Sequence, residues 1–284
     1  VRSVDWVLFL AVFTLILLGL AAIYSVELSK EAVGFVHVKK QFAALALGAV
    51  LFLFIVRSNY RLLQNYALLL YVLCCALLVG VVLFGQTIRG ATGWYVVGSV
   101  SFQPVEFMKV GLVIALAAYL ARRGRRPFDF KTFWQSAAIT LIPVGLVLLQ
   151  PDLGSASILL GAWGFMALYA GIPWRYVAGL GAVAVLLFAL SWSFLFADYQ
   201  RSRILTFLDP SRDALGEGYN VTQAIIAVGS GGWFGSGLGF GTQSQLKFLP
   251  ESQTDFIFAV LAEELGFFGA GLLVLAFTLV FLRL

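Results

Sequence analysis

Long apolar runs recur along almost the whole sequence and constrain its fold more than any other feature. A membrane-spanning helix needs about 20 predominantly apolar residues, and fewer where neighbouring helices bury it. We therefore expect an all-α polytopic integral membrane protein with about eight transmembrane helices in this chain. The predicted spans are Val4–Tyr24, Phe42–Val56, Tyr66–Phe84, Val105–Leu120, Thr132–Leu149, Ser155–Tyr169, Tyr176–Phe196 and Phe256–Leu282.

The composition supports a membrane protein and excludes the main soluble classes. The 284 residues are 61% hydrophobic and only 12% charged, whereas a soluble domain is about half apolar and about a quarter charged. A soluble globular enzyme, a disordered chain and a disulfide scaffold are all excluded. The adjacent Cys74 and Cys75 lie inside an apolar run, and neighbouring residues do not easily close a disulfide, so we expect them to be packing residues.

Basic residues set the predicted orientation. The densest cluster, Arg122 to Arg126, directly follows an apolar run, which is where the positive-inside rule places cytoplasmic loops. This position favours a membrane loop over nucleic-acid binding, despite the net charge of +5. Alternation of the spans then places the N-terminus in the cytoplasm and residues 197–255 outside. We interpret residues 1–284 as one transmembrane domain with 197–255 as its large extracellular loop, and long ordered loops are usually functional.

Charged residues at the edges of the apolar runs are the first functional candidates, because a charge inside a membrane is costly. Glu106 and Lys109 follow Pro104 at a spacing that puts them on one helix face. They form either a structural ion pair or the lining of a polar cavity, and the sequence leaves both interpretations open. Asp152 lies between two spans, where it is either the N-cap of the following helix or a catalytic group.

The start of the last predicted span carries further carboxylates, Asp255 and the adjacent pair Glu263-Glu264. Asp255 lies where this span meets the large loop, and Glu263 lies two turns deeper. A helix cap explains an acid at the first position, but we expect that capping does not explain Glu263. Carboxylates at graded depth indicate a polar, water-accessible cavity. Because His37 is the single histidine, acid–base chemistry falls to carboxylates or lysine, and Asp255 is the best candidate for a general base.

A glycine-rich run at 229–241 precedes these acids. It contains neither the Walker A pattern nor the dinucleotide-binding pattern of glycines, so a nucleotide loop is not supported. A backbone bend at the membrane surface is favoured, and an anion-binding turn is the alternative.

Several motifs from about residue 89 to 270, taken in order and with their spacing, resemble the SEDS family (shape, elongation, division and sporulation), and its elongation-type members more than its division-type members. They include Arg89-Gly90-Ala91, Phe102-Gln103-Pro104 with Glu106 and Lys109, Gln150-Pro151-Asp152-Leu153-Gly154, Arg203-Ile204, Phe207-Leu208-Asp209-Pro210, Gly229-Ser230-Gly231-Gly232, and Phe248-Leu249-Pro250-Glu251 with Thr254-Asp255-Phe256.

The resemblance implies an activity, a location and a partner. Family members are peptidoglycan glycosyltransferases that polymerise lipid II, an undecaprenyl-diphosphate-linked disaccharide-pentapeptide, at the outer face of the bacterial cytoplasmic membrane. A class B penicillin-binding protein supplies transpeptidation. The family's essential aspartate falls on Asp255, and its other important polar positions fall on Glu106, Lys109 and Asp152. Members usually have about ten membrane helices, and this chain ends at Leu284 after its eighth predicted span.

We expect an inverting glycosyl transfer, in which Asp255 removes a proton from the sugar 4-hydroxyl that attacks the anomeric carbon. The leaving diphosphate needs a cation nearby, and the candidates are, in order, Lys109, then Arg203 or Arg89. Glu106 is expected to orient Lys109.

Asp152 is expected to support the cavity or to help hold a divalent cation, Mg²⁺ or Mn²⁺, although no cofactor is established by the sequence. Lipid II and membrane lipids are the expected ligands, and no nucleic acid is expected.

Two other classes of function remain open at this point. A lipid II flippase would also have a charged cavity and interrupted helices, but it needs access from both faces, whereas most acids here fall on the predicted outer side. A purely structural scaffold leaves Glu106, Lys109 and Glu263 unexplained.

Overall fold

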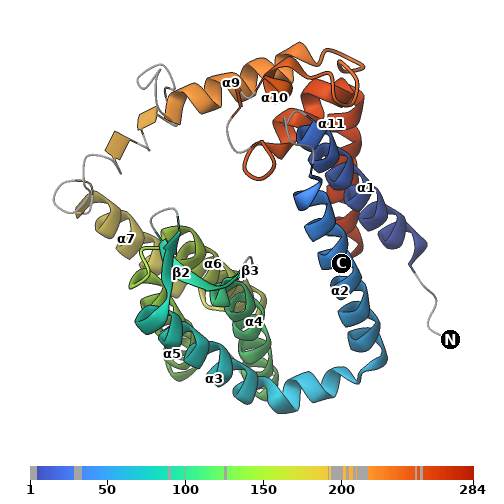
Figure 1. Cartoon of the computed structure of the whole chain (residues 1–284). Coiled ribbons are helices and arrows are strands. Elements are labelled where there is room, and N and C mark those ends of the chain that lie inside the picture. The colour runs from blue at the N-terminus through green and yellow to red at the C-terminus, as the bar shows by residue number, and fades with distance from the viewer. Residues whose placement is uncertain are drawn as a thin grey trace. The chain divides into compact units, whose positions relative to one another are not determined.

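The computed structural model describes residues 5–28, 34–88, 91–98, 100–124, 127–190, 192, 201–202, 205–206, 209, 217–246, 248–249 and 252–284 (Figure 1). The chain divides into two compact units. The first unit comprises Val1–Leu51 and Leu190–Leu284, and the second unit comprises Phe52–Ala189. The prediction of one domain over 1–284 stays a prediction.

Each of the eight predicted spans contains an apolar helix, which confirms a polytopic membrane protein that is nearly all helical. Six of the helices are long and apolar enough to cross a membrane, while α6 and α7 are shorter apolar helices. Within the predicted span 176–196, the structure describes residues 176–190 and 192. The eight helices are α1 (Trp6–Leu28), α2 (Val36–Arg57), α3 (Tyr60–Phe84), α4 (Pro104–Arg122), α5 (Phe130–Leu148), α6 (Leu153–Tyr169), α7 (Trp174–Leu190) and α11 (Ile257–Arg283).

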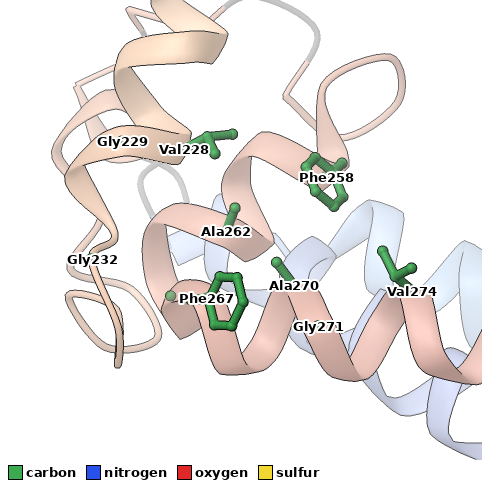
Figure 2. A pocket seen from close by; sticks show the side chains of 10 residues that line it. Val228, Gly229, Gly232, Phe258, Ala262, Phe267, Ala270, Gly271 and Val274 are labelled. Carbon is green, nitrogen blue, oxygen red and sulfur yellow. The ribbon is translucent and has the colours of Figure 1, made fainter.

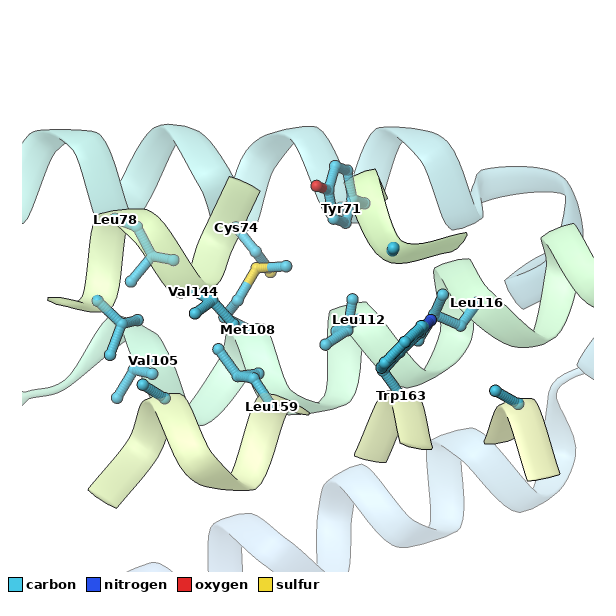
Figure 3. Close-up of a cluster of buried hydrophobic side chains, with 14 of the residues drawn as sticks. Tyr71, Cys74, Leu78, Val105, Met108, Leu112, Leu116, Val144, Leu159 and Trp163 are labelled. Atoms are coloured by element: carbon cyan, nitrogen blue, oxygen red, sulfur yellow. The ribbon is translucent and has the colours of Figure 1, made fainter. Parts of the chain in front are cut away.

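The second unit is held together by an apolar core between α3, α4, α5 and α6 (Figure 3). Leu78, Met108, Leu112 and Leu159 are completely buried there. A Cβ at Gly111 would lie 3.1 Å from the Cys74 sulfur, so α3 and α4 approach closely at this point. Cys74 is free, buried and part of this core, which confirms that it is a packing residue.

A small antiparallel sheet precedes α4, and the sequence analysis did not predict it. Its strands are β1 (Gln86–Ile88), β2 (Ala91–Val97) and β3 (Val100–Phe102), in the order β1-β2-β3. The β2 segment is rich in aromatic and β-branched residues, which favour strands. The Tyr95 hydroxyl donates a hydrogen bond to the Leu77 carbonyl at 3.2 Å, and this bond ties the sheet to α3.

In the first unit α1 packs against α11, and the described residues of the predicted loop 197–255 include two further helices. These are α9 (Glu217–Ser230) and α10 (Thr242–Gln245). Val26, Ala227, Leu249 and Val260 form a small buried core between α1, α9, α11 and the segment after α10. The described part of the predicted loop therefore contains helices that pack against the membrane helices α1 and α11.

Candidate active site

Asp255 lies in a turn at residues 252–256, directly before α11, and its side chain is exposed. The N-cap of α11 is Phe256, which makes no side-chain cap hydrogen bond, so Asp255 does not cap this helix. Within the described part of the chain, the Asp255 carboxylate has no hydrogen-bond or ion-pair partner. The positive end of the α11 dipole lies next to it. Asp255 is thus an open carboxylate that an incoming hydroxyl can reach.

Glu263 is placed differently from what the sequence analysis expects. Its side chain is only 1% exposed, and its carboxylate accepts hydrogen bonds from the N–H groups of Gln243, at 2.8 Å, and Ser244, at 3.2 Å. These residues are in the first turn of α10, whose own N-cap, Gly241, makes no side-chain cap bond.

The expectation that capping does not explain Glu263 is therefore wrong, because Glu263 caps α10 from a different helix. The expected place of Glu263 in a water-accessible cavity is corrected as well. Its carboxylate lies in a closed hydrogen-bond network of the first unit.

Glu264 extends this network toward α1. Its carboxylate accepts hydrogen bonds from the hydroxyl groups of Ser25 and Ser244, and its side chain is 1% exposed. The Gln245 amide also donates to the Ser25 carbonyl, at 3.1 Å. Sequence reasoning missed Ser25 and Ser244, which lie 239 and 20 residues before Glu264. No local sequence pattern links residues at such separations.

The glycine-rich run lets a loop approach the backbone of α11. Gly266 interrupts α11 with φ 66° and ψ −163°, and a Cβ at Gly235 would lie 2.1 Å from the Glu264 carbonyl oxygen. The carbonyls of Glu263 and Glu264 accept hydrogen bonds from the N–H groups of Ser236, at 3.0 Å, and Gly237, at 2.9 Å. These two N–H groups are bonded within the protein, which favours a backbone bend over an anion-binding turn.

In the second unit, Glu106 and Lys109 form the expected ion pair on α4. The Lys109 Nζ lies 2.7 Å from Glu106 Oε1. The Lys109 side chain is 23% exposed and that of Glu106 is 54% exposed. Pro104 is in the first turn of α4, as its spacing predicted. The pair is partly exposed, so the ammonium group of Lys109 remains accessible to an anion.

Asp152 is the N-cap of α6, which confirms one of the two interpretations of this residue. Its carboxylate accepts bonds from the Ser155 N–H, at 2.9 Å, and the Ser155 hydroxyl, at 2.7 Å. The amide of Gln103, the N-cap of α4, lies 3.5 Å from the Asp152 carboxylate. The starts of α4 and α6 are therefore adjacent. Gln150, which is 1% exposed, lies there too, next to Gly93 of β2.

The candidate residues thus fall into two groups. Asp255 and Glu263 belong to the first unit, and Glu106, Lys109 and Asp152 belong to the second. Arg89 and Arg203 lie outside the described residues.

An apolar cavity of about 480 Å³ lies between the end of α9 and the kinked part of α11 (Figure 2). Phe258 and Phe267 contribute aromatic rings, and Val228 and Val274 contribute branched side chains. All its lining residues are apolar or glycine. The cavity therefore suits apolar groups and offers no side-chain partner for a sugar or a diphosphate.

The described residues contain no group of three or more His, Cys, Asp or Glu side chains placed to hold a metal ion. Asp255 and Asp152 each offer one carboxylate, and that of Asp152 is bonded to Ser155. Mg²⁺ is usually held by one or two carboxylates together with substrate phosphates, so a divalent cation stays a proposal for this protein.

Comparison with known proteins reveals extensive similarity. The model of the FtsW/RodA/SpoVE family, described as cell cycle protein, matches residues 5–284. Peptidoglycan glycosyltransferase MrdB of Escherichia coli strain K12 is 40% identical over 247 residues, which are 86% of this chain and 66% of MrdB. The chain therefore spans slightly less than two thirds of that relative.

Solved structures give the same result. A structure concerning the coordination of polymerization and crosslinking by a peptidoglycan synthase complex aligns with a TM-score of 0.79 and 34% identity, covering 100% of this chain and 77% of the other. Rod shape determining protein RodA of Thermus thermophilus aligns with a TM-score of 0.67 and 31% identity, covering 99% of this chain and 74% of the other.

Proposed function

The chain belongs to the FtsW/RodA/SpoVE family, also called the SEDS family, and we propose that it is a peptidoglycan glycosyltransferase that polymerises lipid II into glycan strands during cell elongation and shape maintenance. The observation that carries this proposal is the exposed carboxylate of Asp255 just before α11, which has no partner among the residues that the structure describes. The similarity to a relative named peptidoglycan glycosyltransferase supports it.

The reaction is an inverting displacement at an anomeric carbon. Asp255 accepts the proton of the acceptor sugar's 4-hydroxyl as its oxygen forms the new bond to the anomeric carbon of the donor. The bond from that carbon to the lipid diphosphate breaks, and the diphosphate leaves with the electron pair. A positioned base of this kind typically accelerates the step about 10²–10⁴-fold. The absence of an intramolecular partner within the described chain leaves the Asp255 carboxylate available for this proton.

The departing diphosphate gathers negative charge, which a nearby cation stabilises. We assign this role to Lys109, whose ammonium group is held by Glu106 at 2.7 Å on α4. Arg203 and Arg89 remain proposals on sequence grounds. Asp152 has a structural role as the cap of α6. It contributes to the reaction indirectly, by holding the start of α6 next to the start of α4.

The protein is a multi-pass membrane protein. We further propose that it lies in the bacterial cytoplasmic membrane with its N-terminus in the cytoplasm and Asp255 on the outer side. The basic cluster from Arg122 to Arg126 supports this orientation. A class B penicillin-binding protein is the proposed partner, and the similarity to a component of a peptidoglycan synthase complex supports that.

The proposal is tested with the purified protein in liposomes that contain lipid II, with and without a transpeptidase partner that lacks its own glycosyltransferase. Glycan polymer is measured by gel electrophoresis, and movement of lipid II across the bilayer is measured in parallel. We expect polymer that depends on this protein. Movement of lipid II without polymer would instead support a flippase. The absence of both polymer and lipid II movement would contradict both functions.

A further inference from the structure

The carboxylate of Glu263 occupies the place where a local cap of α10 would otherwise lie. A Cβ built on Gly241, the N-cap residue, would lie 2.7 Å from Glu263 Oε2 and 2.6 Å from the Ser244 hydroxyl oxygen. Gly241 has the extended backbone that N-cap residues adopt, with φ −66° and ψ 117°. The glycine therefore leaves room for a cap that comes from α11.

This cap is joined to the turn that carries Asp255 through a short chain of contacts. The Gln243 carbonyl accepts hydrogen bonds from the N–H groups of Phe248, at 3.1 Å, and Leu249, at 3.3 Å. Leu249 is 2% exposed and packs in the core that includes Val260 of α11. Fixing α10 therefore fixes residues 248 and 249, only a few residues before the turn at 252–256.

The other end of that turn is α11 itself, on which Glu263 lies about two turns after Asp255. One carboxylate thus holds both ends of the segment from α10 to α11. The main-chain carbonyl of Glu263 also accepts hydrogen bonds from the N–H and the hydroxyl of Ser236, at 3.0 and 3.1 Å. The glycine-rich loop is therefore bonded to the same residue.

We propose that Glu263 is a positioning residue for Asp255, acting as an N-terminal cap of α10 supplied by α11. The inference rests on the proposed function for its catalytic consequence, but its structural part stands independently. It predicts that any carboxylate that restores the cap of α10 can replace that of Glu263, because the role lies in holding the segment and not in touching substrate.

The test is a compensating pair of substitutions. Glu263→Ala removes the cap, and Gly241→Asp places a carboxylate at the N-cap of α10, in the space that Glu263 vacates. The Ser244 hydroxyl, 2.6 Å from the new Cβ, has to rotate aside in both variants that carry Gly241→Asp. Gly241→Asp alone forces its new side chain against the carboxylate of Glu263. We expect each single variant to lower kcat for glycan polymerisation about tenfold, and the double variant to recover to within about threefold of wild type. The pH dependence of the residual activity is expected to stay unchanged in all three.

Hydrogen–deuterium exchange provides a readout that does not depend on activity. Glu263→Ala is expected to speed exchange in peptides that cover residues 242–256 about tenfold, and the double variant is expected to reverse this. Peptides of α4 and α5 serve as the folding control. If Glu263→Ala does not fold, Glu263→Gln replaces it in the test. Glutamine keeps one acceptor oxygen, so a smaller increase in the exchange of residues 242–256 is expected.

The outcomes separate the two proposals. Wild-type protein that makes no polymer contradicts the proposed function, while the exchange of residues 242–256 still decides whether Glu263 holds this segment. Active wild type with unchanged exchange in Glu263→Ala overturns the positioning role. Restored exchange with no restored activity in the double variant also overturns it and assigns Glu263 to the chemistry itself.

Discussion

Substitution of Gly266 by alanine is expected to destabilise the first unit strongly. Gly266 has φ 66° and ψ −163°, a backbone region that is essentially restricted to glycine and costs other residues about 1–3 kcal/mol. An added Cβ would also lie 2.3 Å from the Gly235 nitrogen. Because the nearest atoms belong to the backbone of Phe234 and Gly235, they cannot rotate away from the new methyl group. Forced displacement in a packed region typically costs a further ~1–3 kcal/mol.

The expected loss for Gly266→Ala is therefore about 2–6 kcal/mol in the free energy of unfolding. The adjacent hydrogen bond from the Phe267 N–H to the Gly232 carbonyl, at 2.8 Å, would be strained as well. Unfolding by sodium dodecyl sulfate in mixed micelles measures the difference between variants.

Gly271→Ala is the matched control on the same helix, because a Cβ there meets nothing within 4 Å. It is expected to stabilise α11 by about 0.5–1 kcal/mol, since glycine is a poor helix former. If Gly266→Ala unfolds at the same detergent fraction as wild type, the close approach between the glycine-rich loop and α11 is wrong.

Substitutions at three further positions test individual residues. Asp152→Ala should cost about 0.5–2 kcal/mol of stability by removing the cap of α6, whereas Asp152→Asn should cost less; equal losses in thermal denaturation would contradict the cap. Lys109→Met should lower polymerisation about tenfold or more and change stability by less than about 1 kcal/mol, and an unchanged rate would remove Lys109 from the proposed site. The hydroxyl and N–H of Thr132 donate to Asp129 and lower the pKa of its carboxyl. The stability difference between wild type and Asp129→Ala should therefore be fully present above about pH 4 and shrink as pH falls through the lowered pKa, and a pH-independent difference would contradict this.

The membrane helices could be predicted from the sequence because the thickness of a bilayer fixes the length of an apolar run. Their ends were less accurate. The span predicted to begin at Phe42 belongs to a helix that begins at Val36, since Lys39 and Lys40 are good helix formers that a hydropathy criterion excludes. The strands β1 and β3 were missed because strands of three residues carry almost no periodic signal.

The candidate site was only partly predictable. Local spacing was sufficient for the ion pair of Glu106 and Lys109 and for the cap formed by Asp152, because both partners lie within three residues. The role of Glu263 could not be read in this way. Its partners, Gln243 and Ser244, lie 20 and 19 residues earlier in the chain, and only the fold brings them to its carboxylate.

The most direct test of the account compares wild type with Asp255→Asn in glycan polymerisation from purified lipid II, with the transpeptidase partner present. The substitution keeps the size of the side chain and removes the proton acceptor. Asp129→Asn is the control, because it changes another exposed aspartate and asparagine still caps a helix. A loss of about 10²-fold or more in rate for Asp255→Asn alone is predicted, and a rate equal to wild type would contradict Asp255 as the general base.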